Sequence, residues 1–265
     1  MATAALIGST GLVGSRILST LLAPSPATEP ITAVHAFSRR PLPATTADPS
    51  SRLRPHTSSD TASWPADYAS LGAPAVFFSA LGTTRAAAGS FAKQREVDYD
   101  QNLAMAKAAL AAGTTTYVLI SSGGSNEKSL MPYMRMKGEI ETAVSALDFE
   151  HIIILKPGLL IGKRPELRTA EYILQLIAGA LGVISKRWLT DWWAQDAGII
   201  AKAAVKAGVD ASQGKVPEGV GKGSTAASKI QIEPKCKKMA LLTSHPTDNH
   251  IQRQRITYTS HVHYE

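Results

Sequence analysis

The stretch Gly8-Ser9-Thr10-Gly11-Leu12-Val13-Gly14 lies between an apolar run at residues 4–7 and a segment with helical spacing that ends before Pro24. Glycines at a turn between a strand and a helix allow backbone angles that other residues avoid, and they let the backbone approach a diphosphate closely. Free N–H groups and the dipole at the start of the helix then stabilise the anion. The stretch therefore predicts a dinucleotide-binding turn. The alternative is an ordinary glycine-rich turn between a strand and a helix.

The rest of the first 210 residues alternates short apolar runs with helical patterns, which is typical of a parallel sheet covered by helices. Further strands are predicted at residues 31–37, 53–56, 75–81, 116–121 and 152–155, and helices at 91–112, 133–147, 171–181 and 195–207. The strand at 53–56 has the weakest pattern, because it lies in a segment rich in Pro, Ser and Thr. We expect an α/β fold, in which a Rossmann-like, doubly wound parallel sheet with helices on both faces forms one NAD(P)-binding domain over residues 1–210.

Apolar periodicity disappears after about residue 210. Residues 211–265 carry eight Lys or Arg against four Asp or Glu, and four of the seven histidines fall within the last 21 residues. A segment of this composition cannot bury enough apolar surface to offset its chain entropy. We therefore expect a basic, disordered tail after a single domain.

Composition limits the class of protein. With 44% hydrophobic and 18% charged residues, the 265-residue chain is globular. Its net charge of +7 permits an anionic partner such as a phosphorylated cofactor or a lipid surface. The tail lysines lack the interleaved aromatic residues of a nucleic-acid-binding module, so nucleic acid is not an expected partner. A single cysteine, Cys236, excludes an internal disulfide and a cysteine-based zinc site, and no metal site is expected.

Targeting segments are not evident in the sequence. The longest apolar run with helical spacing, residues 172–184, has 13 residues, and a helix that spans a membrane needs about 20. Met1 is followed almost directly by the first predicted strand, so we expect no secretory leader. The cytosol, or a surface that faces it, is the expected compartment.

The second predicted strand ends in Ser38-Arg39-Arg40. An acidic residue at this place commonly binds the ribose 2′-hydroxyl of NAD, whereas an arginine can pair with the 2′-phosphate of NADP. The two arginines therefore favour NADP(H) over NAD(H). They could also be ordinary solvated residues before Pro41.

A second set of residues suggests acid/base chemistry. Tyr133 and Lys137 are four residues apart and lie on one face of a predicted helix. A nearby ammonium lowers the pKa of a phenol, which makes the tyrosine a usable general acid or base. Ser121 and Ser122 end the strand before this helix, and a hydroxyl there could hydrogen-bond a substrate carbonyl.

Taken with the glycine turn, these residues resemble an atypical or extended short-chain dehydrogenase/reductase. More narrowly, the chain resembles the Tat-interacting-protein oxidoreductase group and its fungal mitochondrial outer-membrane relatives. Besides the glycine turn, the strings that carry the resemblance are Leu81-Gly82-Thr83-Thr84-Arg85, Ala88-Gly89, Val97-Asp98, Ser121-Ser122, Tyr133-x-x-x-Lys137-Gly138-Glu139 and Lys156-Pro157-Gly158-Leu159-Leu160. They cover about residues 2–208.

The resemblance implies a role for each matching residue. Tyr133 would be the acid/base, Lys137 would lower its pKa and hold the nicotinamide ribose, and Ser122 would orient a carbonyl. Pro157 would lie beside the nicotinamide. The adenosine side would be lined by Ala80, Leu81 and Gly82. The substrate would be a small carbonyl compound or alcohol.

The sequence departs from the family pattern at Asp98, where the superfamily's proton relay usually has asparagine. This departure leaves two functions open. The chain could be an NADP(H)-dependent oxidoreductase, or a catalytically weak NAD(P)(H)-binding sensor attached peripherally to the cytosolic face of the mitochondrial outer membrane. Trp188, Trp192 and Trp193 could form an aromatic membrane anchor or could pack beside the substrate. A purely cytoplasmic location is the alternative.

Overall fold

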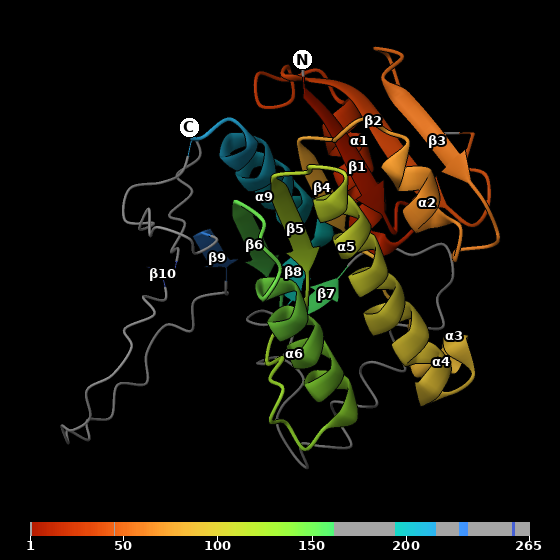
Figure 1. Cartoon of the computed structure of the whole chain (residues 1–265), viewed down its shortest axis with the longest axis vertical. Helices are drawn as coiled ribbons and strands as arrows, with labels where there is room; N and C mark the ends of the chain where they lie inside the picture. Colours follow the sequence, from red (N-terminus) through yellow and green to blue (C-terminus); the bar gives the residue numbers. More distant parts are fainter. Residues whose placement is uncertain (1, 45, 162–193, 216–227, 233–255, 258–265) are drawn as a thin grey trace.

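The computed structural model describes residues 2–44, 46–161, 194–215, 228–232 and 256–257. Its centre is a parallel sheet in the order β3-β2-β1-β4-β5-β6, which β9 and β10 extend beyond β6 (Figure 1). The strands are β1 (Ala2–Ile7), β2 (Ile31–Ser38), β3 (Leu53–Thr57), β4 (Val76–Ser79), β5 (Thr116–Ile120), β6 (His151–Leu155), β9 (Ser228–Ile232) and β10 (Ile256–Thr257). A separate parallel pair joins β7 (Leu159–Ile161) to β8 (Ala194–Asp196). The predicted Rossmann-like doubly wound fold is confirmed.

Helices cover both faces of the sheet, and each face has its own apolar core. On one face α1 (Leu12–Leu22) packs against α9 (Ala197–Ser212). The other face carries α2 (Trp64–Ala69), α5 (Asn102–Ala111) and α6 (Pro132–Ser145), and Figure 1 shows α5 and α6 in front of the sheet. The central strands β4 and β5 are buried throughout, because helices exclude water from both of their faces.

The strand order reverses between β1 and β4. Chain connections leave these two strands in opposite directions across the sheet, which opens a crevice at their carboxyl ends. In open α/β sheets this crevice is the usual place for a ligand. The glycine turn follows β1, and the segment 80–83 follows β4, so both lie at this point of the sheet.

Several helices differ from the sequence-based expectation. The helix predicted over 91–112 is divided into α4 (Phe91–Arg95), a π-helical turn η1 (Glu96–Gln101) and α5. The helix predicted over 195–207 spans Ala197–Ser212. It begins at Ala197 because residues up to Asp196 pair as β8 and the Asp196 carboxylate then caps the helix. The short helices α2 and α3 (Arg85–Ala88) were not predicted.

Two expectations fall wholly or mostly on parts of the chain that the structure does not describe. The helix expected at 171–181 lies outside the described residues. Of the expected tail, the structure describes the end of α9 up to residue 215 and the strands β9 and β10. Disorder of the remaining tail stays a prediction.

Candidate functional site

The glycine turn is packed directly against the segment that follows β4. Gly8 has a φ of +80°, and a Cβ added there would lie 2.4 Å from the Ala80 carbonyl oxygen. A Cβ added at Gly14 would lie 2.0 Å from the Gly8 carbonyl oxygen. The Gly11 N–H donates to that same oxygen at 2.9 Å. Side chains at Gly8 and Gly14 would therefore force the turn apart, which explains why glycine stands at both positions.

The start of α1 can accept an anion. Gly11 is its N-cap residue and has no side chain to satisfy the first N–H groups, and the first turn contains no acidic residue. Unsatisfied N–H groups and the positive end of the helix dipole attract a negatively charged group. Ser9 ties the turn to β2, because its buried hydroxyl donates to the Phe37 carbonyl at 3.2 Å. The predicted dinucleotide turn, residues 8–14, thus combines a closely packed backbone with a helix start that a negatively charged group could approach.

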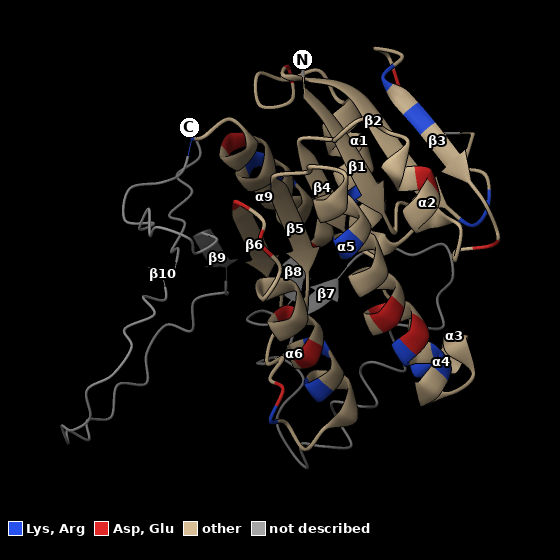
Figure 2. Cartoon of the chain, viewed as in Figure 1, with Lys and Arg blue, Asp and Glu red and all other residues tan. Residues whose placement is uncertain are grey.

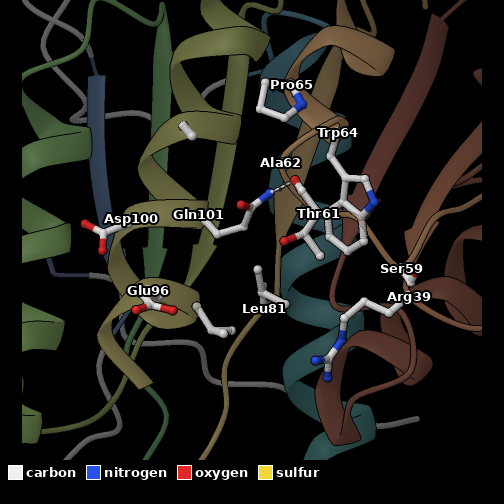
Figure 3. A pocket seen from close by; sticks show the side chains of 12 residues that line it. Arg39, Ser59, Thr61, Ala62, Trp64, Pro65, Leu81, Glu96, Asp100 and Gln101 are labelled. Atoms are coloured by element: carbon white, nitrogen blue, oxygen red, sulfur yellow. Dashed lines mark hydrogen bonds between the residues drawn. The ribbon is translucent and has the colours of Figure 1, made fainter. Parts of the chain in front are cut away.

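Next to this turn, beyond the end of β2, lies a cleft of about 560 Å³. Arg39 stands on one side of it, and Glu96 and Asp100 from η1 stand on the other (Figure 3). The Gln101 amide, which also lines the cleft, donates to the Thr61 carbonyl at 2.7 Å. Leu81, which was expected on the adenosine side, is a further lining residue.

The two predicted arginines occupy different places. Both side chains are exposed, but Arg39 lines the cleft, whereas Arg40 is not among the lining residues. The Arg40 carbonyl accepts a hydrogen bond from the Ser38 hydroxyl at 2.7 Å, which fixes the backbone at the end of β2. The geometry therefore favours Arg39 as the residue that could meet a ligand in the cleft.

Tyr133 and Lys137 lie on α6, as predicted. The Tyr133 side chain is partly exposed in the first turn, and Lys137 is buried one turn later. Pro132 occupies the first position of the helix, where its missing N–H costs nothing. The sequence thus places a solvent-accessible phenol next to a buried ammonium.

Lys137 forms a buried ion pair that the sequence did not reveal. Its Nζ lies 3.0 Å from Oδ1 of Asp98, and both side chains are almost inaccessible to solvent. Burial alone lowers the pKa of Lys137, but the Asp98 carboxylate, followed by Tyr133 and Glu141, raises it above its ordinary value. Lys137 is therefore held in its charged form.

Ser122 lies in the loop after β5 and is partly buried. Its hydroxyl has one long contact, 3.5 Å to the Gly123 carbonyl. The loop is fixed on both sides, because the Asn126 N–H donates to the Met134 carbonyl on α6 at 3.1 Å and the Gly123 N–H donates to the Pro157 carbonyl at 2.6 Å. Ser122 and Pro157 are thus held in segments that contact each other.

Behind this loop lies a buried polar cluster that sequence reasoning missed. The Ser121 and Ser125 hydroxyls both donate to Glu141, and Lys156 Nζ lies 3.2 Å from the other Glu141 oxygen. Lys156 also donates to the Ser125 carbonyl at 3.0 Å. One available signal was the spacing of Glu141, which lies four residues after Lys137 on the same helix face. The cluster joins the ends of β5 and β6 to α6.

A second missed residue is Asn102, at the start of α5. It is buried, its amide oxygen accepts from the Ser79 hydroxyl, and its amide N–H groups donate to the carbonyls of Val97 (3.0 Å), Asp98 (3.1 Å) and Leu81 (3.3 Å). These bonds tie the end of β4 to the π-helical turn. Asn102 is therefore a buried amide four residues after Asp98.

The segment after β4 connects the two halves of the site. At one end, Gly8 packs against Ala80 and Leu81. At the other, a Cβ added at Gly82 would lie 3.3 Å from Oδ1 of Asp98 and 3.7 Å from Nζ of Lys137. The glycine turn and the buried ion pair are thus separated only by a few residues of one backbone segment.

Some expectations concern residues beyond the described part. Trp188, Trp192 and Trp193 lie outside the described residues. Within the described ranges, no helix is both long and apolar enough to cross a bilayer. Those ranges also contain no group of His, Cys, Asp and Glu side chains suited to a metal ion.

Solved structures share this fold at low sequence identity. A short-chain dehydrogenase family protein from Francisella tularensis matches 87% of this chain and 97% of its own, with a TM-score of 0.59 and 12% identity. MoeE5 in complex with UDP-glucuronic acid and NAD matches 87% of this chain and 76% of its own, with a TM-score of 0.57 and 18% identity. These likenesses show that the chain has the fold of short-chain dehydrogenase/reductase proteins.

Sequence comparison gives the narrower family. The HIM1 family model matches residues 51–179. Protein fmp52, mitochondrial, of Emericella nidulans is 51% identical over 220 residues, covering 83% of this chain and 92% of its own. The Aspergillus fumigatus protein of the same name is 52% identical over 220 residues, which also cover 83% of this chain and 92% of its own. The Neurospora crassa relative is 46% identical over 221 residues, covering 80% of this chain and 88% of its own. The chain belongs to this family of fungal proteins named fmp52.

Proposed function

We propose that the protein is an NADP(H)-dependent oxidoreductase that interconverts a small carbonyl compound and its alcohol. The observation that carries the proposal is the shared backbone segment 80–83, which packs against the glycine turn at one end and beside Lys137 at the other. A dinucleotide bound at the turn would therefore have the Tyr133–Lys137 pair within the same crevice.

The residues present fit such a cofactor. Its diphosphate would lie at residues 8–14, where two glycines leave no room for side chains and the start of α1 offers free N–H groups. Its adenosine end would lie in the cleft lined by Arg39 and Leu81. Lys137 would hold the nicotinamide ribose, and Pro157 would lie beside the ring. When bound, the nicotinamide supplies or accepts the hydride.

Three side chains of the chain itself would do the rest. Tyr133 would give the proton to the carbonyl oxygen during reduction and would take it back during oxidation. The charged Lys137 ammonium would stabilise the negative charge that develops during this proton transfer. The Ser122 hydroxyl, which makes only a long contact within the protein, would donate to the substrate oxygen.

Arg39 supports the preference for NADP(H). A guanidinium in the cleft beside the end of β2 can form charge-assisted hydrogen bonds with a 2′-phosphate. Glu96 and Asp100 face it across the cleft and would repel a phosphate placed on their own side. The phosphate would therefore bind at the Arg39 side.

The experiment is to measure NADPH oxidation with a panel of small aldehydes and ketones, using the wild-type protein and Tyr133→Phe. We expect turnover by the wild type and at least a 100-fold loss in the variant, because general acid/base catalysis is typically worth about 10²- to 10⁴-fold. NADPH affinity should stay within about twofold. Equal turnover by the two proteins would refute the catalytic role of Tyr133.

A second function is favoured by the direct Asp98–Lys137 ion pair, which differs from the relay of ordinary members of the superfamily. The protein could be a catalytically weak NAD(P)(H) sensor on the cytosolic face of the mitochondrial outer membrane. The relatives' names place them in the mitochondrion. Tight NADPH binding without oxidation by any compound of the panel would support the sensor. Failure to sediment with anionic liposomes at low salt would count against direct membrane attachment.

A further inference from the structure

Asp98 lies in the π-helical turn η1, between α4 and α5. A π-helical turn includes one extra residue and is frequent at functional sites. Here the turn is supported by the Asn102 amide, which donates to the carbonyls of Val97 and Asp98. The Asp98 side chain is directed inward and is 1% exposed.

Both carboxylate oxygens of Asp98 are occupied. Oδ1 lies 3.0 Å from Nζ of Lys137, and Oδ2 accepts the Thr83 N–H at 2.7 Å. Gly82, the residue before Thr83, is close to the ammonium, because a Cβ added at Gly82 would lie 3.7 Å from Lys137 Nζ. Asp98 therefore fixes the ammonium against the backbone segment that also contacts the glycine turn.

The charges around Lys137 make Asp98 its main counterion. On its own helix, Lys137 is near Tyr133 and near Glu141, whose carboxylate is also shared with Lys156 and two serine hydroxyls. From η1, the Asp98 carboxylate forms an ion pair with Lys137, and among the described residues no other ion pair to Lys137 is found. A buried ammonium without a counterion prefers to lose its proton.

We propose that Asp98 is a positioning residue, whose carboxylate keeps the Lys137 ammonium charged and fixed on the helix face that it shares with Tyr133. An asparagine at this place, as in the usual relay, would supply no compensating charge. The value of this role for catalysis rests on the proposed function, but the charge state of Lys137 can be measured without any turnover.

The test follows the ¹³Cε signal of Lys137 by NMR in protein labelled with ¹³C-lysine, over the pH range in which the protein stays folded. Lys137→Arg removes one signal and thereby assigns it. In the wild type, the titration midpoint of Lys137 should lie above the ordinary lysine pKa of about 10.4. In Asp98→Asn, whose side chain can still accept the Thr83 N–H, the midpoint should fall by about 2 pH units or more.

An unchanged Lys137 midpoint in folded Asp98→Asn would overturn the proposal. The wild type provides an independent test if that variant folds poorly, because a Lys137 midpoint clearly below the ordinary lysine pKa of about 10.4 would refute the role as well. Turnover by Asp98→Asn should decline as the pH rises through the lowered midpoint. The double variant Asp98→Asn/Lys137→Arg should lack this pH-dependent decline, because a guanidinium keeps its proton. If Asp98→Asn lowers turnover only by disturbing the structure, the decline should persist in the double variant. If no NADPH binds at all, the proposed function fails while the NMR result still decides the role of Asp98.

Discussion

Replacing Gly14 by alanine tests the glycine turn, and two effects of opposite sign compete. Gly14 is the third residue of α1, and alanine in a helix is favoured over glycine by about 1 kcal/mol. The new Cβ, however, would lie 2.0 Å from the Gly8 carbonyl oxygen and 2.7 Å from the Gly8 carbonyl carbon. These are backbone atoms, so the contact cannot be relieved by turning a side chain.

The size of the required movement decides which effect dominates. A contact of 2.0 Å must open by about 1 Å to reach the closest approach that Cβ atoms show. Overpacking of this kind costs about 1–3 kcal/mol and usually exceeds the gain in helix propensity. Subtracting the gain of about 1 kcal/mol leaves a net loss of up to about 2 kcal/mol, which lowers the Tm by up to roughly 8 °C for a domain of this size.

The effect on ligand binding should be larger than the effect on stability. A turn displaced by about 1 Å no longer directs its N–H groups at a diphosphate, and each hydrogen bond to a charged group is worth about 1.5–3 kcal/mol. The Kd for NADPH should therefore rise about tenfold or more. Titration followed by NADPH fluorescence measures the Kd, and a thermal melt measures the Tm.

Ser15→Ala is the matched control, because Ser15 is exposed on the adjacent position of the same helix and its hydroxyl makes only a local 3.3 Å bond to the Leu12 carbonyl. It should bind NADPH like the wild type. If folded Gly14→Ala binds NADPH as tightly as this control, the turn does not hold the diphosphate and the assignment of the site is wrong.

Two further predictions concern the cleft and the sheet edge. Arg39→Ala should weaken NADPH binding about tenfold and leave NADH binding unchanged, because it removes charge-assisted hydrogen bonds to the 2′-phosphate. Arg40 lies outside the cleft, so Arg40→Ala should change neither Kd when both are measured by calorimetry. An equal effect of the two variants on NADPH binding would contradict the assignment of Arg39. His35 Nδ1 and His56 Nε2 are 3.0 Å apart, and burial lowers the pKa of both rings. The unfolded chain therefore binds more protons below about pH 6.5, so the free energy of unfolding should fall on acidification. Urea unfolding between pH 5 and 8 measures this slope, which the double variant with glutamine at both positions should reduce; a stability that rises on acidification would contradict the sign.

The sheet could be predicted from the sequence because its signals are local. Five of the strands stand out as short apolar runs, and their alternation with helical patterns predicts a parallel sheet covered by helices. The π-helical turn η1 could not be predicted, because its residues also fit a continuous helix and the turn depends on Asn102 reaching the carbonyls of Val97 and Asp98. Helix α2 was missed because its six residues are too few to show a period.

The candidate site divides in the same way. Tyr133 and Lys137 are neighbours on one helix, so their spacing alone brings them together. Arg39 and Arg40 are indistinguishable in the sequence, and only the folded chain shows that Arg39 lines the cleft while Arg40 does not. Glu141 and Lys156 could not be paired in advance, because α6 and the end of β6 meet only in the folded chain.

The sequence by itself determined the glycine turn, the alternation of strands and helices and the Tyr133–Lys137 spacing, because each depends on backbone freedom or periodicity within one short segment. Only the tertiary structure decided that Asp98 is the counterion of Lys137 and that residues 80–83 join this pair to the glycine turn. Charge pairing in a protein interior depends on which distant segments exclude water together, and no local pattern of residues records that.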